Sequence, residues 1–405
     1  MTSDRVHWIF LTPSYPPDQG GIADYTWVLA RELASRGDLV DIWTGPRPVN
    51  TQPLAAPGVS VFHLPAHFTP SSCRILEREI ARIPGEKRIL VQYVPQPLGP
   101  RPGTRFKGFP LWFCYWLRRQ HTVPVWLMLH EAETVCYEGM HWKLRLIHRL
   151  SQSMLSWSLA SASRVFYAMP AWERVLRRHQ SVAPAEYLPI PSNIETDVSP
   201  AEARRVRNRL LDSSSRYVLG HFGTYSREVT ELLKPVLQEV LQTQPHVQVL
   251  LIGQGSCEFA IQLRSYSRRV IATGALESRE VAAHLAACDL MLQPFPDGAS
   301  TRRGSVMAAL ALGVPVLSNL GSNSEGIWLE SGALALAGIE SMPQRIASLL
   351  DDPEQRETIG VAGKILYGQR FSVQRTLEQL RHHPSNATGW PSNVPTAPRG
   401  PQCAP

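Results

Sequence analysis

The chain has 405 residues, of which 43% are hydrophobic and 19% are charged. This composition excludes a wholly disordered chain, a collagen and a long coiled coil. No apolar run approaches the roughly 18 residues that a membrane-spanning helix needs, and the run at residues 8–11 is too short for a secretory signal. The six cysteines are scattered without a C-x-x-C pair, so we expect neither a zinc knuckle nor a disulfide framework but a cytoplasmic protein.

The net charge of +7 lies entirely in the first half of the chain. Residues 1–190 contain 21 Lys and Arg against 14 Asp and Glu, whereas residues 191–405 contain 20 of each. A basic half attracts anionic partners such as a phospholipid surface, although it also serves solubility. Two segments that combine aromatic or apolar residues with basic ones, 107–120 and 143–155, could rest on a membrane surface. The alternative is that both are helices that face the core. We expect no nucleic-acid partner.

Strand-like and helix-like segments alternate through the first half. Near-continuous apolar runs such as RILVQYV (88–94) and VPVWLMLH (123–130) are typical of parallel strands that are covered on both faces. We predict strands at 6–12, 38–44, 59–64, 88–94, 123–130 and 164–169, and helices at 25–37, 109–120 and 141–160.

The second half repeats the alternation, with strands at 217–223, 247–253, 269–274, 290–295 and 315–319 and helices at 228–243, 258–266, 278–289 and 303–312. Such alternation predicts parallel sheets with right-handed crossovers, and hence an α/β protein of two doubly wound, Rossmann-like domains. Pro, Ser and acidic residues cluster at 189–200, so we place the domains at 1–190 and 191–383. We expect the last helix to pack back on the first domain and the Pro- and Ser-rich tail at 384–405 to be disordered.

Two glycine loops follow predicted strands. Gly20 and Gly21 stand between the first strand and the first helix, where they allow a close approach to the backbone and leave the helix N-terminus as an anion site. A tight strand–helix turn is the alternative. Gly253 and Gly255 form a similar loop, which is not the dinucleotide fingerprint because Glu258 replaces its third glycine.

The segment 294–305 is the densest in polar groups and lies between a strand and a helix. Two adjacent arginines there have guanidinium forks that match phosphate oxygens, and the helix N-terminus adds its dipole. We predict a diphosphate site, the alternative being a solvated helix cap. Its candidate residues are Asp297, Gly298, Ala299, Ser300, Arg302, Arg303 and Ser305.

His130 and Glu131 begin a zincin-like H-E pair, but the second histidine is absent, which excludes a zinc protease. Neither a P-loop nor an Asp-x-Asp motif occurs. We therefore expect no metal and no cofactor. His130 ends a predicted strand, where it could hydrogen-bond a ligand or serve only the structure.

Several segments together resemble the GT-B glycosyltransferases, specifically glycosyltransferase family 4. They are GGIADYTWVLARELASRGDLVDIWT, QYVPQPLG, MLHE, TGALESREVAAHLAACDLMLQPF and ALALGVPVLSN, and the similarity runs over about residues 1–380. The resemblance implies two domains that face each other across a cleft. It also implies retaining, metal-independent transfer of a sugar from a nucleoside-diphosphate sugar. The acceptor would be a glycan, a lipid-linked group or a small molecule, as in polysaccharide or glycolipid assembly.

The chain departs from the family pattern at the donor site. The family's two glutamates, eight positions apart, correspond here to Ser300 and Ala308, and its Arg and Lys after the first strand of the second domain correspond to Thr224 and Val229, with Arg227 nearby. Our hypothesis is that Arg302 and Arg303 take over the phosphate contacts and that Asp297 contacts a sugar hydroxyl.

The resulting predictions assign catalysis to His130, Asp297, Arg302 and Arg303, and the acceptor to Glu131. The predicted donor-binding residues are Gly20, Gly21, Gly223, Arg227, Gly253, Gly255, Leu276, Gly298, Ala299, Ser300 and Ser305. Leu276 would line the base pocket, or belong to the core. Two other functions stay open: a non-catalytic module that binds a nucleotide sugar, and a nucleotide-sugar epimerase. We expect a cytoplasmic location, with peripheral contact at the inner face of the membrane.

Overall fold

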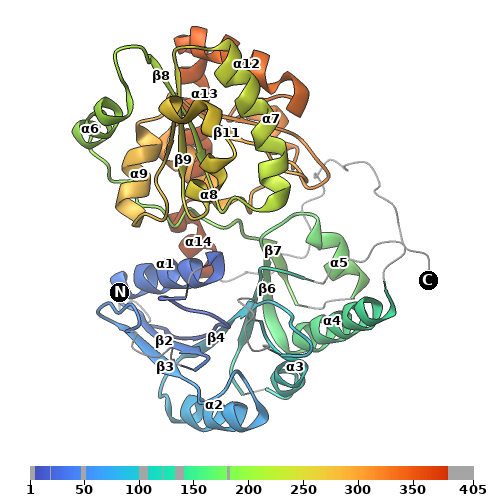
Figure 1. Cartoon of the computed structure of the whole chain (residues 1–405). Coiled ribbons are helices and arrows are strands. Elements are labelled where there is room, and N and C mark those ends of the chain that lie inside the picture. Colours follow the sequence, from blue (N-terminus) through green and yellow to red (C-terminus); the bar gives the residue numbers. More distant parts are fainter. Residues whose placement is uncertain are drawn as a thin grey trace. The chain divides into compact units, whose positions relative to one another are not determined.

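A computed structural model describes residues 5–18, 20–46, 52–99, 108–120, 122–132, 141–179 and 183–381. Over these residues the chain forms two compact units that divide between Pro189 and Ile190, each a sheet between helices (Figure 1). Residues 379–381, at the end of the last helix, belong to the first unit. The predicted tail at 384–405 lies outside the described residues.

The first unit contains a seven-stranded sheet in the order β3-β2-β1-β4-β5-β6-β7, with every neighbouring pair parallel. Its elements are β1 (His7–Leu11), α1 (Gly21–Ser35), β2 (Leu39–Thr44), β3 (Val59–His63), α2 (Pro70–Arg82), β4 (Lys87–Tyr93), α3 (Leu111–Leu117), β5 (Val125–Leu129), α4 (Trp142–Ser161), β6 (Ala162–Tyr167), α5 (Trp172–Arg178) and β7 (Ala185–Tyr187).

Both faces of this sheet are covered, as the apolar strands require. Alternate residues of β1 show the division, because Ile9 and Leu11 join the core cluster with α2, α3 and α4. Trp8 points to the other face, fully buried, and its Nε1 donates to Asp38 at 3.0 Å. Burial of this apolar surface on both sides is what drives the parallel sheet to form.

Charged groups on the second face attach the end of α14 (Val373–Arg381) to the first unit. Arg164 is almost fully buried, lies against the Trp126 ring at 4.9 Å, and donates to Glu186 and to the carbonyl oxygen of Gln379. Arg381 donates to Asp38 at 2.7 Å. These bonds satisfy two buried charges and hold the last turn of α14 in place.

The second unit contains a six-stranded parallel sheet in the order β10-β9-β8-β11-β12-β13. Its elements are α6 (Pro200–Leu210), β8 (Tyr217–Phe222), α7 (Arg227–Thr243), β9 (Val247–Ile252), α8 (Ser256–Ile261), a 3-10 turn (Arg264–Arg269), β10 (Val270–Ala272), α9 (Ser278–Ala286), β11 (Leu290–Gln293), α10 (Gly304–Leu312), β12 (Val316–Ser318), α11 (Ile327–Glu330), β13 (Ala335–Leu336), a 3-10 turn (Ile339–Ser341), α12 (Met342–Asp351), α13 (Pro353–Leu366), a π turn (Tyr367–Phe371) and the start of α14.

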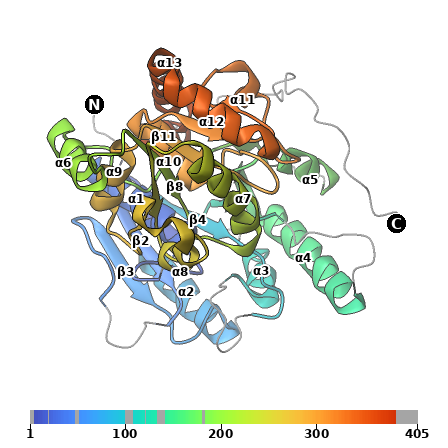
Figure 2. The same cartoon turned by 45° about the horizontal axis from the view of Figure 1, so that its top comes forward.

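Helices also cover this second sheet on both faces (Figures 1 and 2). One core cluster joins α9 and α10 to the sheet, and the other joins α7, α8 and α12 to the opposite face. Helix α10 is buried along most of its length, which explains why its sequence is apolar all round rather than amphipathic. The prediction of two doubly wound Rossmann-like units is therefore confirmed.

The strands predicted from sequence are confirmed in type and place. The predictions missed α2, α5, α6 and the helices from α11 to α13, together with the short strands β7 and β13. The segment predicted as one helix at 258–266 is wrong in part, because α8 ends at Ile261 and a 3-10 turn follows from Arg264.

Each sheet has one position where the strand order reverses. In the first unit this is between β1 and β4, and in the second it is between β8 and β11. In doubly wound sheets the loops beyond the carboxyl ends of these two strands diverge to opposite faces and leave a crevice where ligands bind. The residues that follow β1, β4, β8 and β11 are therefore candidates for a ligand-binding site.

Glycine at 253 is required by packing, and this gives a stability prediction. Gly253 has φ +109°, and a Cβ added there would lie 2.5 Å from the Gly223 carbonyl oxygen. We expect Gly253→Ala to lower the free energy of unfolding by about 2–4 kcal/mol, from backbone strain plus a steric clash. Gly332→Ala is the matched control, because φ is +65° there but nothing lies within 4 Å of the added Cβ. Urea unfolding that shows equal losses for the two variants would contradict the packing role of Gly253.

Candidate functional site

The strands β8 and β11 part at their carboxyl ends. Their backbone pairing joins Leu219 to Leu290 and Gly220 to Met291. Beyond these residues, hydrogen bonds from side chains connect the two strands. His221 Nδ1 lies 2.8 Å from the Leu292 carbonyl oxygen, and Gln293 Nε2 donates to the Phe222 carbonyl oxygen at 3.1 Å. The sheet is therefore open at its switch point but held by two side-chain bridges.

The glycine loops after β8 and β9 interlock beside this opening. Gly223 follows β8, and its carbonyl oxygen occupies the space that a side chain on Gly253 would need. A Cβ on Gly255 would lie 3.3 Å from the Thr224 carbonyl oxygen. Tyr225 completes the turn with φ +53°, a strained value for a residue with a side chain. Packing thus accounts for Gly253 and Gly255, which the sequence assigned to the donor.

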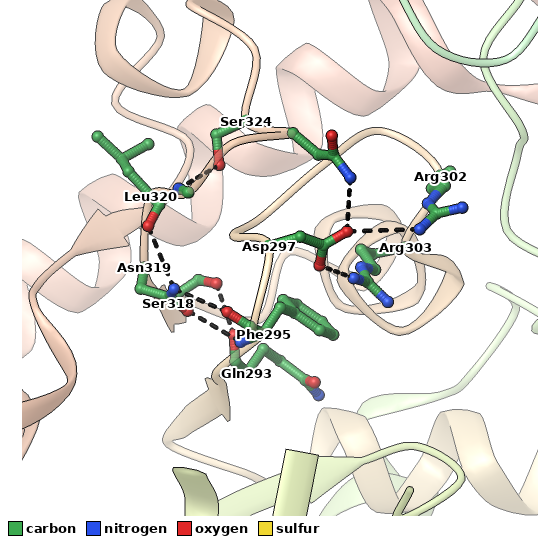
Figure 3. A network of polar contacts seen from close by, with 11 residues as sticks. Gln293, Phe295, Asp297, Arg302, Arg303, Ser318, Asn319, Leu320 and Ser324 are labelled. Carbon is green, nitrogen blue, oxygen red and sulfur yellow. Dashed lines mark hydrogen bonds and ion pairs between the residues drawn. The ribbon is translucent and has the colours of Figure 1, made fainter. Parts of the chain in front are cut away.

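The loop after β11 is fixed to the loop after β12 by side-chain bonds (Figure 3). Asn319 accepts from the Phe295 backbone N–H at 2.9 Å and donates to the Phe295 carbonyl oxygen at 2.8 Å. Gly298, with φ +83°, lies close to Gly321, and a Cβ added to Gly298 would lie 2.2 Å from the Gly321 backbone nitrogen. Glu325 accepts from the Thr301 side chain at 2.7 Å and from the Trp328 indole at 2.7 Å. This loop is therefore preorganised.

Asp297 holds both arginines of the segment (Figure 3). Its carboxylate accepts from Arg303, from Arg302 at 3.4 Å and from Asn323 at 2.7 Å. Partial burial of Asp297 opposes its charge, but the Asn323 bond and the charges of Arg303 and Arg302 keep its pKa below the ordinary value. Arg303 also stacks on the Phe295 ring at 4.4 Å. The two guanidiniums and one carboxylate leave one net positive charge beside α10.

Helix α10 starts directly after this pair. Its nine residues begin at Gly304, above which an added Cβ would meet nothing within 4 Å. Ser305, in the first turn, donates through Oγ to Gln293 at 3.3 Å. The first N–H groups of a helix have no partner within it and carry partial positive charge. Open space, two guanidiniums and a helix N-terminus together form a candidate anion site.

Three buried polar atoms in these segments have no hydrogen-bond partner. They are His221 Nε2, Ser300 Oγ and Arg303 Nε. The Ser300 side chain is fully buried and that of His221 is 2% exposed. Buried polar groups are nearly always paired, so unpaired ones at the open edge of a sheet indicate a place for a ligand.

The first unit presents its own polar edge. Gly20 has φ +150° and ψ 153°, a conformation that belongs essentially to glycine, and neither Gly20 nor Gly21 has an atom within 4 Å of an added Cβ. Among the described residues, no atom crowds the Cα positions of these two glycines at the start of α1. Gln19, between Asp18 and Gly20, lies outside the described residues.

His130 lies at the same edge. It follows β5 and contacts the Tyr25 ring of α1 edge-to-face at 5.1 Å, and its Nε2 is 2.6 Å from Gln92 Oε1 on β4. Burial lowers the pKa of His130 to about 3. His130 is thus neutral at pH 7, and because Nε2 donates to Gln92, Nδ1 is left as an acceptor. Gln92 is fully buried, and its Nε2 has no partner.

The remaining predicted residues lie elsewhere or face inward. Arg227 points to solvent, with its side chain 86% exposed and paired to Glu231 on its own helix. Ala299 is fully buried, and its backbone N–H donates to the Asn319 carbonyl oxygen. Leu276 packs against the core cluster around α9 and α10, in agreement with the core alternative. Glu131 is exposed, with its N–H 3.5 Å from the Tyr93 carbonyl oxygen.

Sequence reasoning missed four residues that shape these edges: His221, Gln92, Asn323 and Glu325. His221 had a visible signal, a histidine at the end of an apolar strand just before a glycine turn. Gln92, likewise, is a polar residue inside an apolar strand. No sequence signal marked Asn323 or Glu325, because each contacts the loop from more than 20 residues away in the chain.

The described residues provide neither a membrane-spanning helix nor a cluster of metal ligands. No helix there is long and apolar enough to cross a membrane. Within the same residues, no group of three or more His, Cys, Asp or Glu is placed to hold a metal ion.

Two doubly wound units, each with one reversal of strand order, define the class: the chain has the GT-B fold. Similar solved structures support this over nearly the whole chain. Sucrose-phosphate synthase from Thermosynechococcus elongatus is 19% identical with a TM-score of 0.68, covering 92% of this chain and 98% of that one. Anabaena HepE, solved in complex with UDP and glucose, is 17% identical with a TM-score of 0.60, covering 92% and 98%.

Residues 20–193 match the family model of the glycosyl transferase 4-like domain. A relative from Corynebacterium glutamicum, a GDP-mannose-dependent monoacylated alpha-(1-6)-phosphatidylinositol monomannoside mannosyltransferase, is 24% identical over 211 residues. This match covers 48% of the chain and 54% of the relative, so the chain spans about half the length of that enzyme. The chain is therefore a GT-B protein that resembles glycosyltransferase family 4, and its first unit carries the match.

The buried neutral state of His221 predicts a pH-dependent stability. Burial lowers its pKa to about 4, from an ordinary value of 6.5. The unfolded chain therefore binds a proton that the folded chain does not, so stability falls as the pH drops below 6.5 toward 4. Urea unfolding at pH 7.5 and at pH 5.5 measures this effect. Between these two pH values, we expect the free energy of unfolding of the wild type to fall by about 1 kcal/mol more than that of His221→Asn. Equal losses would show that His221 is protonated in the folded protein.

Proposed function

We propose that this protein is a glycosyltransferase that moves a sugar from a nucleoside-diphosphate sugar to an acceptor. The observation that carries the proposal is the anion site after β11, where Arg302, Arg303 and the N-terminus of α10 meet in a preorganised loop. A diphosphate has the charge and the oxygen geometry that guanidinium forks and helix N–H groups bind. The family match at residues 20–193 and the names of the similar proteins support the same activity.

The chemistry at this site is departure of the diphosphate. When the bond between the anomeric carbon and the phosphate oxygen breaks, negative charge grows on that oxygen, and the acceptor hydroxyl forms the new bond and loses its proton. Fixed cations and backbone dipoles stabilise the growing charge more than the ground state, which lowers the barrier. Asp297 would keep the two guanidiniums in position while their remaining N–H groups bind the diphosphate. On this proposal no metal is needed, and the anomeric configuration is retained.

His130 would bind a hydroxyl rather than take a proton. Its pKa of about 3 makes it a weak base at pH 7, but its Nδ1 is an acceptor at the open edge of the first sheet. Gly20 and Gly21 follow β1 at the same edge, and neither has a described atom within 4 Å of an added Cβ. We propose that this edge binds sugar hydroxyls, with Glu131 on the acceptor side.

Two arginine variants test the anion site. We expect Arg302→Ala combined with Arg303→Ala to reduce release of nucleoside diphosphate from UDP-glucose or GDP-mannose at least 100-fold, because the developing charge loses its cations. EDTA should leave the wild-type rate unchanged. Arg279→Ala is the control, since Arg279 pairs with Glu202 on α6.

The outcomes separate the alternative functions. Binding of the nucleotide sugar without release, even with acceptors supplied, would favour a non-catalytic module, which the loss of both family glutamates at Ser300 and Ala308 makes the second candidate. Conversion of the donor to its epimer without release would favour an epimerase. Release that the double arginine variant does not affect would contradict the proposed site.

A lipid-linked acceptor is supported by the surface of the first unit. Helix α4 begins with three exposed apolar residues, Trp142 (64%), Leu144 (43%) and Leu146 (50%), which alternate with Lys143 and Arg145. Helix α3 packs against α4 (Figure 2). Its Trp112 and Tyr115 are exposed. Exposed aromatic and apolar side chains between basic ones are typical of helices that lie on anionic membranes. We propose that this α3–α4 surface makes peripheral contact with such a membrane from the cytoplasmic side.

Vesicle binding tests the α3–α4 surface. We expect the protein to bind liposomes that contain phosphatidylglycerol, and to bind at least tenfold more weakly at 500 mM salt than at 50 mM, because exposed charges are screened. Replacing Trp142, Leu144 and Leu146 by Ser should abolish binding. The control replaces Ile261 and Leu329 of the second unit by Ser, since these two residues are at least as exposed, at 65% and 67%. Salt-insensitive binding, or equal effects of both variants, would refute the contact.

A further inference from the structure

The unpartnered nitrogen of His221 has a defined chemical character. Its Nδ1 lies 2.8 Å from the Leu292 carbonyl oxygen, which can only accept, so Nδ1 must carry the hydrogen. Burial keeps the ring neutral at pH 7. Nε2 is therefore a lone-pair acceptor without a hydrogen. The tautomer of the His221 ring is fixed by the same hydrogen bond that connects β8 to β11.

This acceptor lies at the open edge of the second sheet. Nε2 is buried and without a partner, and a Cβ on Gly223 would lie 3.5 Å from it, so it faces the turn that follows β8. The Tyr225 ring packs edge-to-face on the imidazole at 5.1 Å, and the Tyr225 hydroxyl donates to the His221 carbonyl oxygen at 3.2 Å. The ring is thus clamped on two sides and cannot turn to find another partner.

The positively charged groups of the proposed anion site are all donors. Arg302, Arg303 and the N–H groups of α10 can only donate, and a phosphate offers them acceptor oxygens. An acceptor nitrogen cannot bind an unprotonated phosphate. It needs an N–H or O–H group, which a nucleotide sugar carries on its base, its ribose and its sugar.

We propose that His221 Nε2 accepts a hydrogen bond from a hydroxyl or N–H of the bound nucleotide sugar outside the diphosphate, and so acts as a specificity-determining residue at the β8–β11 opening. This inference rests on the proposed function, because it assumes that a nucleotide sugar binds beside α10. It assigns one residue to the recognition of the nucleoside or the sugar, and the two arginines to the diphosphate.

Two variants separate the role of Nε2 from that of the bridge. His221→Asn places an amide where Nδ1 stood, keeps the donor to Leu292, and has no group at the position of Nε2. His221→Gln extends an amide oxygen to the position of Nε2 and gives up the bridge. We expect His221→Asn to keep a melting temperature near that of the wild type at pH 7.5. His221→Gln should melt lower but bind better than His221→Asn.

Calorimetric titration of these variants with pyrophosphate, UDP, GDP, UDP-glucose and GDP-mannose tests the proposal. His221→Asn should lower the affinity for the nucleotide sugar that the wild type binds by about 5- to 10-fold, as the loss of one neutral hydrogen bond implies. Its affinity for pyrophosphate should be unchanged. If the nucleoside supplies the hydrogen, the affinity for UDP or GDP falls as much as the affinity for the nucleotide sugar. If the transferred sugar supplies it, only the nucleotide sugar weakens.

Two results would overturn the proposal, and they differ from failure of the proposed function. Unchanged affinity of His221→Asn for every ligand would show that Nε2 makes no contact. Equal weakening of pyrophosphate would show that the substitution disturbs the anion site instead. If the wild type binds none of the nucleotides, the proposed function fails and this assignment fails with it.

Discussion

The second unit depends on the way β8 and β11 separate at their carboxyl ends. Backbone pairing ends after Gly220 and Met291, and the side chains of His221 and Gln293 make the next bonds across the gap. A sheet that stayed paired would fill the crevice, and one that parted without bridges would leave buried carbonyl groups unsatisfied. The two bridges let the edge stay open while the carbonyl groups of Leu292 and Phe222 are satisfied.

The proposed anion site follows the strand β11 at this opening. The loop after β11 reaches α10 only because Asn319 and Glu325 hold its two ends, and because Gly298 and Gly321 lack side chains where the loops approach. Within it, Asp297 prevents two adjacent guanidiniums from repelling one another and sets their direction. Preorganisation of this kind removes much of the cost of orienting charges when an anion arrives.

The sequence predicted the sheet architecture because strands buried on both faces are continuous apolar runs, as in residues 88–94 and 123–130. The glycine turns and the arginine pair were equally visible, since their chemistry is local. Helix α2 and strand β13 were missed, the latter because two residues carry no periodicity. The pairing of Asp297 with both arginines and the bridge from His221 to Leu292 could not be predicted, because they depend on how separate segments meet in space.

The central claim is that the diphosphate of a nucleotide binds at the N-terminus of α10. A crystal structure of the protein with UDP or GDP measures this most directly. The account predicts density for the diphosphate within hydrogen-bonding distance of the Gly304 or Ser305 N–H groups and of Arg302 or Arg303. A nucleotide bound at another edge, with both arginines still paired to Asp297 and not to the diphosphate, would contradict it.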